Sequence, residues 1–282
     1  MGYRSGAGLG LGIAESGQTG LDNLKRLQAL LVNALDRGDH DMFAPALLDP
    51  ATVYWLPPIP NSSLFMTFHG NGIGNWRDRA VAMSSRRITS RVPACRLHPP
   101  TAHLGHLEPM IFAKGEPVPY GNELGVVIAP GGKDISFEDA PKHLWGIMNC
   151  DDVTRGGVWP RHFPPPEQWS KHEGECKARL ARASDASCPS GPWITTVDEM
   201  PNVLDLLMYS WGPDGGYDRA HTWAYIMGPS NAVAYLSRFM TLPAGTVLQL
   251  AASKVSMGLG TSPIRSPCMA RWLKSNVNGL VC

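Results

Sequence analysis

Apolar residues recur at helical spacing near the start of the chain. Leu21, Leu24, Leu27, Leu30 and Leu31 recur at intervals of three and four, with polar and basic residues between them. This period places the leucines on one face of an amphipathic helix, and a short second helix is predicted through "APALL". Residues 1–19 are rich in Gly and Ser and are expected to form a tail, because too few residues precede "GAGLGLG" for the strand that a dinucleotide-binding loop requires.

From "YWLPPIPNSSLFMTF" onward the pattern changes to short apolar runs that Pro and Gly interrupt, which is typical of strands. The predicted strands are Leu64–Phe68, Met110–Ala113, Leu124–Ala129, Leu144–Met148, Trp193–Thr196, Leu207–Trp211 and Val247–Leu250. Two helices are predicted, one over "SFEDAPKHLWG" with Ser136 as N-cap and one over "GPSNAVAYLSRFMTL". The segment Gly156–Ala186 is Pro-rich and then charged, so it is expected to run over the surface. The whole pattern predicts an α+β, β-rich fold, with residues 1–50 as a tail and small helical portion and residues 51–282 as the main domain.

Charge and composition narrow the possible partners. The 25 basic and 24 acidic residues give a net charge of +1 with no long run of one sign, so neither nucleic acid nor an anionic membrane is an expected partner. No apolar run approaches the length of a membrane span, and no signal-peptide core is visible. The six cysteines form no CxxC pair, which favours reduced thiols and a cytoplasmic location.

Three carboxylates at the edges of apolar runs raise the possibility of a metal site. Glu123 precedes one run, and Asp151 and Asp152 follow another. Hard cations such as Mg²⁺ bind one to three carboxylates and complete their coordination with water and substrate oxygens. The spacing alone also fits the exposed polar ends of two strands, so both interpretations stay open.

Two other groups of residues give weaker indications of a functional site. His98, His103, His106 and Glu108 in "LHPPTAHLGHLEP" resemble zinc ligands in spacing, but the Pro-Pro pair opposes the helix that would align them, so a loop of unrelated histidines is the simpler interpretation. Cys188 has no His at an informative offset, which favours a packed small residue over a nucleophile.

Four blocks of sequence together resemble the fumarylacetoacetate hydrolase (FAH) superfamily. They are "LPPIPNSSLFMTF", "NELGVVIAPGGKDISFEDAPKHLWGIMNCDDVTRG", "DASCPSGPWITTVDE" and "AVAYLSRFMTLPAGTVL". The resemblance covers roughly Thr52 to Gly260. It implies mixed sheets rolled around a central pocket, a homodimer, and Mg²⁺ or Mn²⁺ bound by an E-x-E pair plus an Asp. In such a site the metal chelates a 1,3-dicarbonyl or 2-oxo acid and stabilises an enolate.

The match to the family's metal ligands is incomplete. Glu123 corresponds to the second acid of E-x-E, whereas Gly121 stands where the first is expected. Asp152 corresponds to the third ligand, with Asp151 in place of the Asn before it. The resemblance therefore implies Glu123 and Asp152 as metal ligands, with Asp151 as a replacement for the missing one. A glycine at position 121 removes a full negative charge from a site built for a divalent cation.

The other site positions also depart from the family pattern. In the lid segment "HGNGIGNWRD", Asn71 is kept, while Asn75 and Asp78 replace a His-Glu pair. Arg182 stands where a Lys is usual. The site residues that the resemblance implies are Asn75, Asp78, Arg182 and Asp185 as catalytic or orienting groups, and Asn71, Arg182 and Ser253 as substrate contacts.

Two functions remain in competition. The first is a re-purposed enzyme, of a biosynthetic or catabolic pathway, that acts on a small β-dicarbonyl or enolisable oxo acid by C–C cleavage, decarboxylation, dehydration, tautomerisation or cyclisation. In that enzyme Arg182 would hold a substrate carboxylate by bidentate hydrogen bonds. The second is a non-catalytic binding or scaffold protein of the same fold. An enzyme should keep convergent titratable groups in its pocket, whereas a scaffold should fill it with apolar residues.

Overall fold

A mixed six-stranded sheet forms the centre of the protein. The computed structural model describes residues 9–49, 52–69, 93–106, 108–111, 117–155, 168, 170–200, 202–211, 217–259, 264–265 and 272–274. The strand order is β2 (Ala94–Leu97), β1 (Phe65–His69), β11 (Thr246–Leu259), β5 (Pro117–Ile128), β6 (Leu144–Val153) and β8 (Thr195–Thr196). The β1–β11 pair is parallel and the other neighbours are antiparallel. The prediction of a β-rich α+β fold with a small N-terminal helical portion is confirmed.

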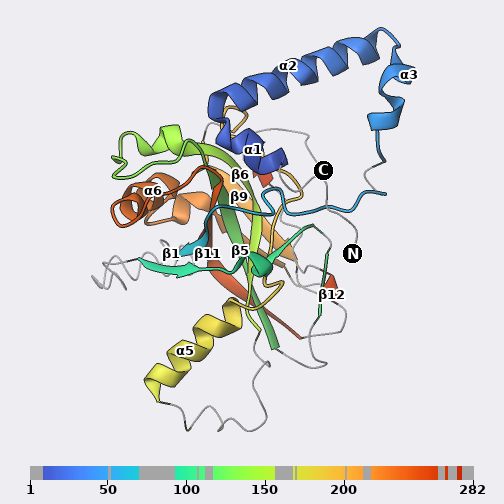
Figure 1. Ribbon diagram of the computed structural model, residues 1–282. Helices are drawn as coiled ribbons and strands as arrows, with labels where there is room; N and C mark the ends of the chain where they lie inside the picture. Colours follow the sequence, from blue (N-terminus) through green and yellow to red (C-terminus); the bar gives the residue numbers. More distant parts are fainter. Residues whose placement is uncertain are drawn as a thin grey trace.

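Smaller sheets accompany the central one, and Figure 1 labels β9 (Leu206–Trp211) and β12 (Ile264–Arg265) from two of them. One contains β10 (Tyr217–His221), β9 and β13 (Trp272–Lys274). Two more are the pairs β12 with β4 (Pro109–Met110), and β3 (His103–Leu104) with β7 (Cys188–Pro189). The apolar runs predicted the positions of β1, β5, β6, β9 and β11, although β5, β6 and β11 extend beyond the runs.

The N-terminal helices extend outward from the body of the molecule (Figure 1). They are α1 (Leu9–Glu15), α2 (Gly17–Asp36) and α3 (His40–Phe43), followed by the 3₁₀ turn η1 (Ala44–Ala46). The leucine pattern therefore predicted α2 correctly, but the expected tail over residues 1–19 is wrong from Leu9 onward. Gly10 explains the difference, because an ideal Cβ there would lie only 2.2 Å from the Pro58 carbonyl oxygen. The glycine lets α1 pack directly on that backbone.

The helix predicted over "SFEDAPKHLWG" is wrong in extent. Ser136 does accept a hydrogen bond from the Asp139 backbone N–H, but only the 3₁₀ turn η3 (Ala140–His143) follows. From Leu144 onward the chain pairs with β5 as strand β6. Pairing with a buried neighbour strand therefore overrides the local helical signal.

The surface excursion expected over Gly156–Ala186 contains a regular helix, α5 (Lys171–Arg182). Its N-terminus is a capping box. The Ser170 hydroxyl accepts from the Glu173 backbone N–H at 3.2 Å, and the Glu173 carboxylate accepts from the Ser170 backbone N–H at 2.8 Å. The backbone N–H groups of Ser170 and Glu173, two of the four that have no intrahelical partner at the start of a helix, are satisfied in this way. The helix ends at Arg182, which brings that side chain back to the central sheet.

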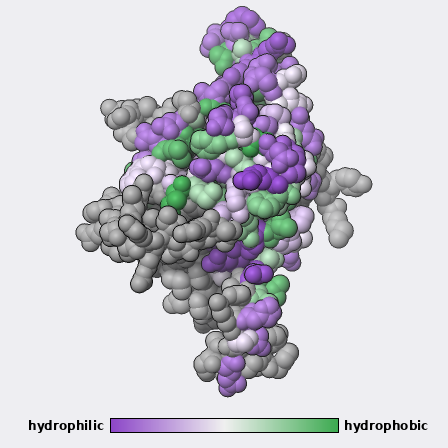
Figure 2. Space-filling model, turned by 90° about the vertical axis from the view of Figure 1, so that its left-hand side faces the viewer, coloured by the Kyte–Doolittle hydropathy of each residue, from purple (hydrophilic) through white to green (hydrophobic). Residues whose placement is uncertain are grey.

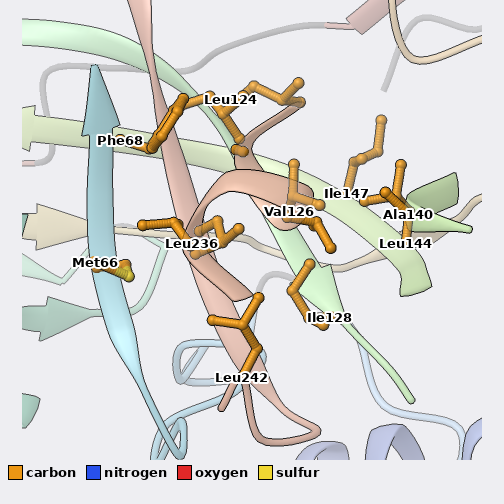
Figure 3. Packing of buried hydrophobic residues seen from close by; sticks show 14 of the residues in the cluster. Met66, Phe68, Leu124, Val126, Ile128, Ala140, Leu144, Ile147, Leu236 and Leu242 are labelled. Carbon is orange, nitrogen blue, oxygen red and sulfur yellow. The ribbon is translucent and has the colours of Figure 1, made fainter. Parts of the chain in front are cut away.

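The hydrophobic core lies on both faces of the central sheet. On one face, residues of β1, β5, β6 and β11 pack against α6 (Pro229–Ser237). Figure 3 shows Leu236 of α6 among side chains of these strands, with Leu242 close by. The second face carries a smaller cluster that includes Phe65, Val127 and the thiols of Cys150 and Cys188. Successive residues of one strand therefore contribute to two cores, and the same alternation sorts the polar residues at the strand ends.

Among the described residues that Figure 2 colours, hydrophobic residues are interspersed with hydrophilic ones. Within the described residues, no helix has both the length and the hydrophobicity that a membrane span needs.

Candidate active site

The pleat of β5 and β6 separates the three predicted carboxylates. Gly121 pairs with Asp152, and Glu123 pairs with Cys150, whereas Asp151 pairs with Asn122. Paired residues of an antiparallel ladder share a face, and neighbours along a strand alternate. Glu123 and Asp152 therefore belong to the same face, and Asp151 belongs to the other. All three carboxylates are at least 94% buried, so the interpretation as exposed strand ends is wrong.

Gly121 leaves space that the Glu123 side chain uses. An ideal Cβ at position 121 would lie 2.7 Å from Oε1 of Glu123, which is inside van der Waals contact. The Glu123 carboxylate thus lies over the glycine backbone. Any side chain at position 121 would have to displace it.

Asp152 forms an ion pair with an arginine from the opposite edge of the sheet. Its Oδ2 accepts a hydrogen bond from Arg96 Nη2 at 2.6 Å; the Asp152 side chain is buried and that of Arg96 is only 13% exposed. Nη1 of Arg182 lies 3.9 Å from the same oxygen, and the Arg182 Nε donates to the Thr154 hydroxyl at 3.1 Å. Two guanidinium groups therefore converge on one buried carboxylate.

A directional chain of hydrogen bonds supports this ion pair. Nε2 of Gln249 donates to the Asp151 carbonyl at 2.7 Å, so its Oε1 faces Thr67 and accepts from the Thr67 hydroxyl at 2.8 Å. With its proton used, the hydroxyl accepts from Nε2 of His98 at 2.5 Å and from Arg96 at 3.2 Å. The chain therefore assigns the proton of His98 to Nε2.

The other nitrogen of His98 completes the chain. Its Nδ1 lies 3.5 Å from Sγ of Cys188, and the ring also has a hydrogen bond to the Arg182 backbone. Burial lowers the pKa of His98 to about 4, with the neighbouring Arg96 acting in the same direction. Burial also raises the pKa of the Cys188 thiol well above its ordinary value. Both groups are neutral at pH 7, so the prediction that Cys188 is a packed residue is consistent with its burial and its raised pKa.

His69, at the end of β1, is a titratable neighbour of the same ion pair. Burial is the main cause that lowers its pKa, and the positive charge of Arg96 lowers it further, while Asp152 partly opposes both. A neutral imidazole beside two guanidinium groups can accept a proton.

The histidine-rich loop has a structural explanation. The rings of His98 and His103 pack on Phe65 at centroid distances of 4.7 and 3.9 Å. Glu108 accepts hydrogen bonds from the Tyr54 hydroxyl and the Gly105 backbone N–H. These contacts give the loop a packing role, and the described residues contain no group of three ligands that could hold a metal.

The remaining predicted site residues are only partly placed. Arg182 reaches Asp152 as described, and Asp185 is exposed in the turn after α5. Ser253 falls in the irregular stretch of β11 between Ala251 and Val255, and its side chain is outside the described residues. Residues 70–92, which include Asn71, Asn75 and Asp78, also lie outside the described residues.

Sequence patterns did not identify Arg96, Thr67 or His69 as site residues. Arg96 and Asp152 are 56 residues apart, and Thr67 and Gln249 are 182 apart. One usable signal was the alternation in "ACRLH", which places Cys95 and Leu97 on one side of a strand and Arg96 and His98 on the other.

The family's divalent cation does not fit the described side chains well. Gly121 supplies no ligand, Asp151 belongs to the opposite face, and Oδ2 of Asp152 is engaged by a guanidinium. Of the three predicted carboxylates, Glu123 and Asp152 remain on the site face. A divalent cation there would be held by fewer negative charges and would meet a buried arginine.

Together, the fold and the site define an α+β protein with a buried ionic cluster on one face of a mixed sheet. The family model described as fumarylacetoacetate (FAA) hydrolase C-terminal matches residues 73–253. The chain therefore belongs to the fumarylacetoacetate hydrolase superfamily, as its resemblance implied.

Known relatives are distant. A protein of Burkholderia ambifaria that carries only a general hydrolase name is 29% identical over 182 residues, covering 56% of this chain and 58% of the relative. The chain thus spans less than two thirds of the curated relatives that it matches.

Solved structures agree with the fold. The 2-hydroxyhepta-2,4-diene-1,7-dioate isomerase from Mycobacterium marinum is 25% identical, with a TM-score of 0.54 and coverage of 76% of this chain and 70% of that one. Maleylpyruvate hydrolase from Sphingobium sp. SYK-6, in complex with manganese(II) and pyruvate, is 20% identical, with a TM-score of 0.56 and coverage of 86% and 83%.

Proposed function

We propose that this protein is an enzyme that acts on a small β-dicarbonyl or enolisable 2-oxo acid. The observation that carries the proposal is the convergence of Arg96 and Arg182 on the buried carboxylate of Asp152, with His69 within electrostatic range of all three groups. Buried charges are costly, and a pocket without function would tend to replace them with apolar residues. The named activities of the relatives, an isomerase and a hydrolase of oxo or enol acids, support the same substrate class.

Formation of an enolate is the step that all the candidate reactions share. A base removes a proton from carbon 3, the C–H electron pair forms the C2–C3 double bond, and the carbonyl electrons move onto oxygen. His69 is the proposed base, because its lowered pKa keeps the imidazole neutral. Arg182 and Arg96 would stabilise the oxyanion and the substrate carboxylate. Asp78, Asp185 and Asn75 remain proposed orienting groups, and Asn71 and Ser253 remain proposed substrate contacts.

The proposal is tested by hydrogen exchange at carbon 3. Oxaloacetate and acetylpyruvate are incubated with the protein in D₂O, with and without Mn²⁺, and deuterium uptake and product formation are followed by NMR. We expect turnover above the buffer rate, reduced about 100-fold in Arg182→Met and unchanged in Arg179→Met, since Arg179 is exposed on the same helix. Loss of one oxyanion contact typically has an effect of this size.

The alternative is a non-catalytic binding protein of the same fold. It is favoured by Gly121 and by the engagement of Asp152 with Arg96, which together weaken the family's metal site. If a folded protein accelerates neither exchange nor product formation for any acid of the panel under either condition, the enzyme proposal is wrong and this alternative replaces it. A homodimer and a cytoplasmic location are proposed for both cases.

A further inference from the structure

The Arg96–Asp152 pair lies where the family pattern calls for a cation. Asp152 corresponds to a metal ligand of the family, yet the charge that meets its Oδ2 at 2.6 Å belongs to Arg96. The Arg96 side chain is 13% exposed and that of Asp152 is 5% exposed, so the pair is shielded from water. Thr67 accepts from the same Nη2 and holds the guanidinium in this orientation.

Two buried polar atoms of the pair have no hydrogen-bond partner among the described residues. Nε of Arg96 and Oδ1 of Asp152 are buried and form no hydrogen bond with any described residue. One is an obligatory donor, and the other is an acceptor when the carboxylate is ionised. Buried groups of this kind are nearly always satisfied, if not by protein then by water or a ligand. The pair therefore keeps one donor and one acceptor whose hydrogen-bonding capacity no described residue uses, and a bound molecule could satisfy both.

The enol form of a 2-oxo acid matches this arrangement. Its carboxylate accepts a hydrogen bond, and the enol hydroxyl on the adjacent carbon donates one. The carboxylate can accept from Nε of Arg96 while the hydroxyl donates to Oδ1 of Asp152. The Arg182 guanidinium, which is about one third exposed and lies 3.9 Å from Asp152, adds a second positive charge on the side that reaches solvent.

We propose that Arg96 takes the place of the divalent cation in this protein, so that the Arg96–Asp152 pair binds the carboxylate and enol hydroxyl of a 2-oxo acid without metal. The identity of the ligand rests on the proposed function, whereas the metal-independent anion site rests on the geometry of the pair. The four charged groups, Arg96, Arg182, Asp152 and Glu123, sum to zero, and an incoming carboxylate therefore meets no net negative charge.

Oxalate probes the metal-independent anion site, because it is a planar dianion whose carboxylate can accept from Nε of Arg96; it lacks the hydroxyl that would donate to Asp152. Its binding to EDTA-treated protein is measured by isothermal titration calorimetry, and then measured again with Mn²⁺ in place of EDTA. We expect binding in EDTA that changes less than about twofold with Mn²⁺. Arg96→Met should weaken it at least tenfold, while Arg179→Met should leave it unchanged. Binding that appears only with Mn²⁺ would overturn the inference.

Asp152→Asn distinguishes binding through a metal from binding through Arg96, because the two predict opposite effects on oxalate affinity. The substitution keeps the shape of the side chain, so it also serves as the test if Arg96→Met does not fold. At a metal site the substitution removes a ligand, so oxalate binding weakens. At an arginine site it removes a negative charge beside the guanidinium, so binding of the dianion stays the same or tightens several-fold. A weakening of tenfold or more contradicts the proposal.

The two measurements, oxalate binding and turnover of oxo acids, test the arginine site and the proposed function separately. If oxalate binds in EDTA as expected but no oxo acid is turned over, the enzyme proposal fails and the arginine site stands. If turnover and oxalate binding both require Mn²⁺, the arginine site fails and the enzyme proposal stands.

Discussion

The hydroxyl of Thr67 is the most informative atom to remove. Thr67→Val keeps the shape of the side chain but deletes the oxygen that contacts Gln249 at 2.8 Å, His98 at 2.5 Å and Arg96 at 3.2 Å. Thr67 is fully buried, so water cannot replace the lost partner without a rearrangement. Leaving a buried polar group unsatisfied costs about 1–3 kcal/mol. With two or more partners stranded, we expect the free energy of unfolding to fall by about 2–4 kcal/mol.

Urea unfolding followed by tryptophan fluorescence measures this loss, with a fixed m-value as the check that the folded state is intact. Thr52→Val is the matched control, because its hydroxyl donates to the Asp49 carbonyl at an exposed position, and we expect it to cost less than about 1 kcal/mol. The imidazole ¹⁵N shifts of His98 add a second readout, since the chain of donors requires a proton on Nε2. A loss under about 1 kcal/mol, together with a proton on Nδ1, would refute the proposed direction of the hydrogen bonds.

Three other predictions concern stability. His98 has a folded-state pKa of about 4 and His103 of about 3, against an ordinary value of 6.5, so the unfolded chain binds more protons in that window. The contribution of these neutral histidines to the free energy of unfolding is therefore fully present above about pH 6.5. It is lost as the pH drops toward 4, by on the order of 3 kcal/mol for His98 alone. Urea midpoints that do not decrease between pH 7 and pH 4.5 would contradict this. Gly105→Ala should prevent stable folding, because the added Cβ would lie 1.8 Å from a backbone oxygen, whereas Gly12→Ala meets nothing within 4 Å and should be tolerated; soluble yield and circular dichroism compare the two. Ser170→Ala removes the capping box of α5 and should cost about 1 kcal/mol, and equal urea midpoints for variant and parent would show that the cap does not contribute.

The sequence predicted those parts of the fold that depend on local patterns. The spacing of Leu21, Leu24 and Leu27 is enough for α2, and the apolar run from Leu124 to Ala129 marks the centre of β5. The helix expected after Ser136 was wrong because the partner strand that captures Leu144 lies elsewhere in the sequence.

The site was predicted less completely for a related reason. Glu123 and Asp152 were proposed because each one stands in a recognisable block, and Arg182 because it lies three residues before another. Arg96 stands in no block, and its importance comes from contact with Asp152, 56 residues further along the chain. Which face of the sheet Asp151 lies on depends on the register between β5 and β6. A single sequence does not determine that register when both faces of a strand are buried.

The position of β11 has a consequence for how the chain is made. This strand lies between β1 and β5, although it follows both by more than a hundred residues. On the ribosome, β1 and β5 therefore emerge with no strand between them, and their edges stay open until Thr246 and the residues after it have been synthesised. Contacts over such separations slow folding, and open edges invite pairing with other chains. Production of this protein should consequently depend on chaperone capacity during late translation.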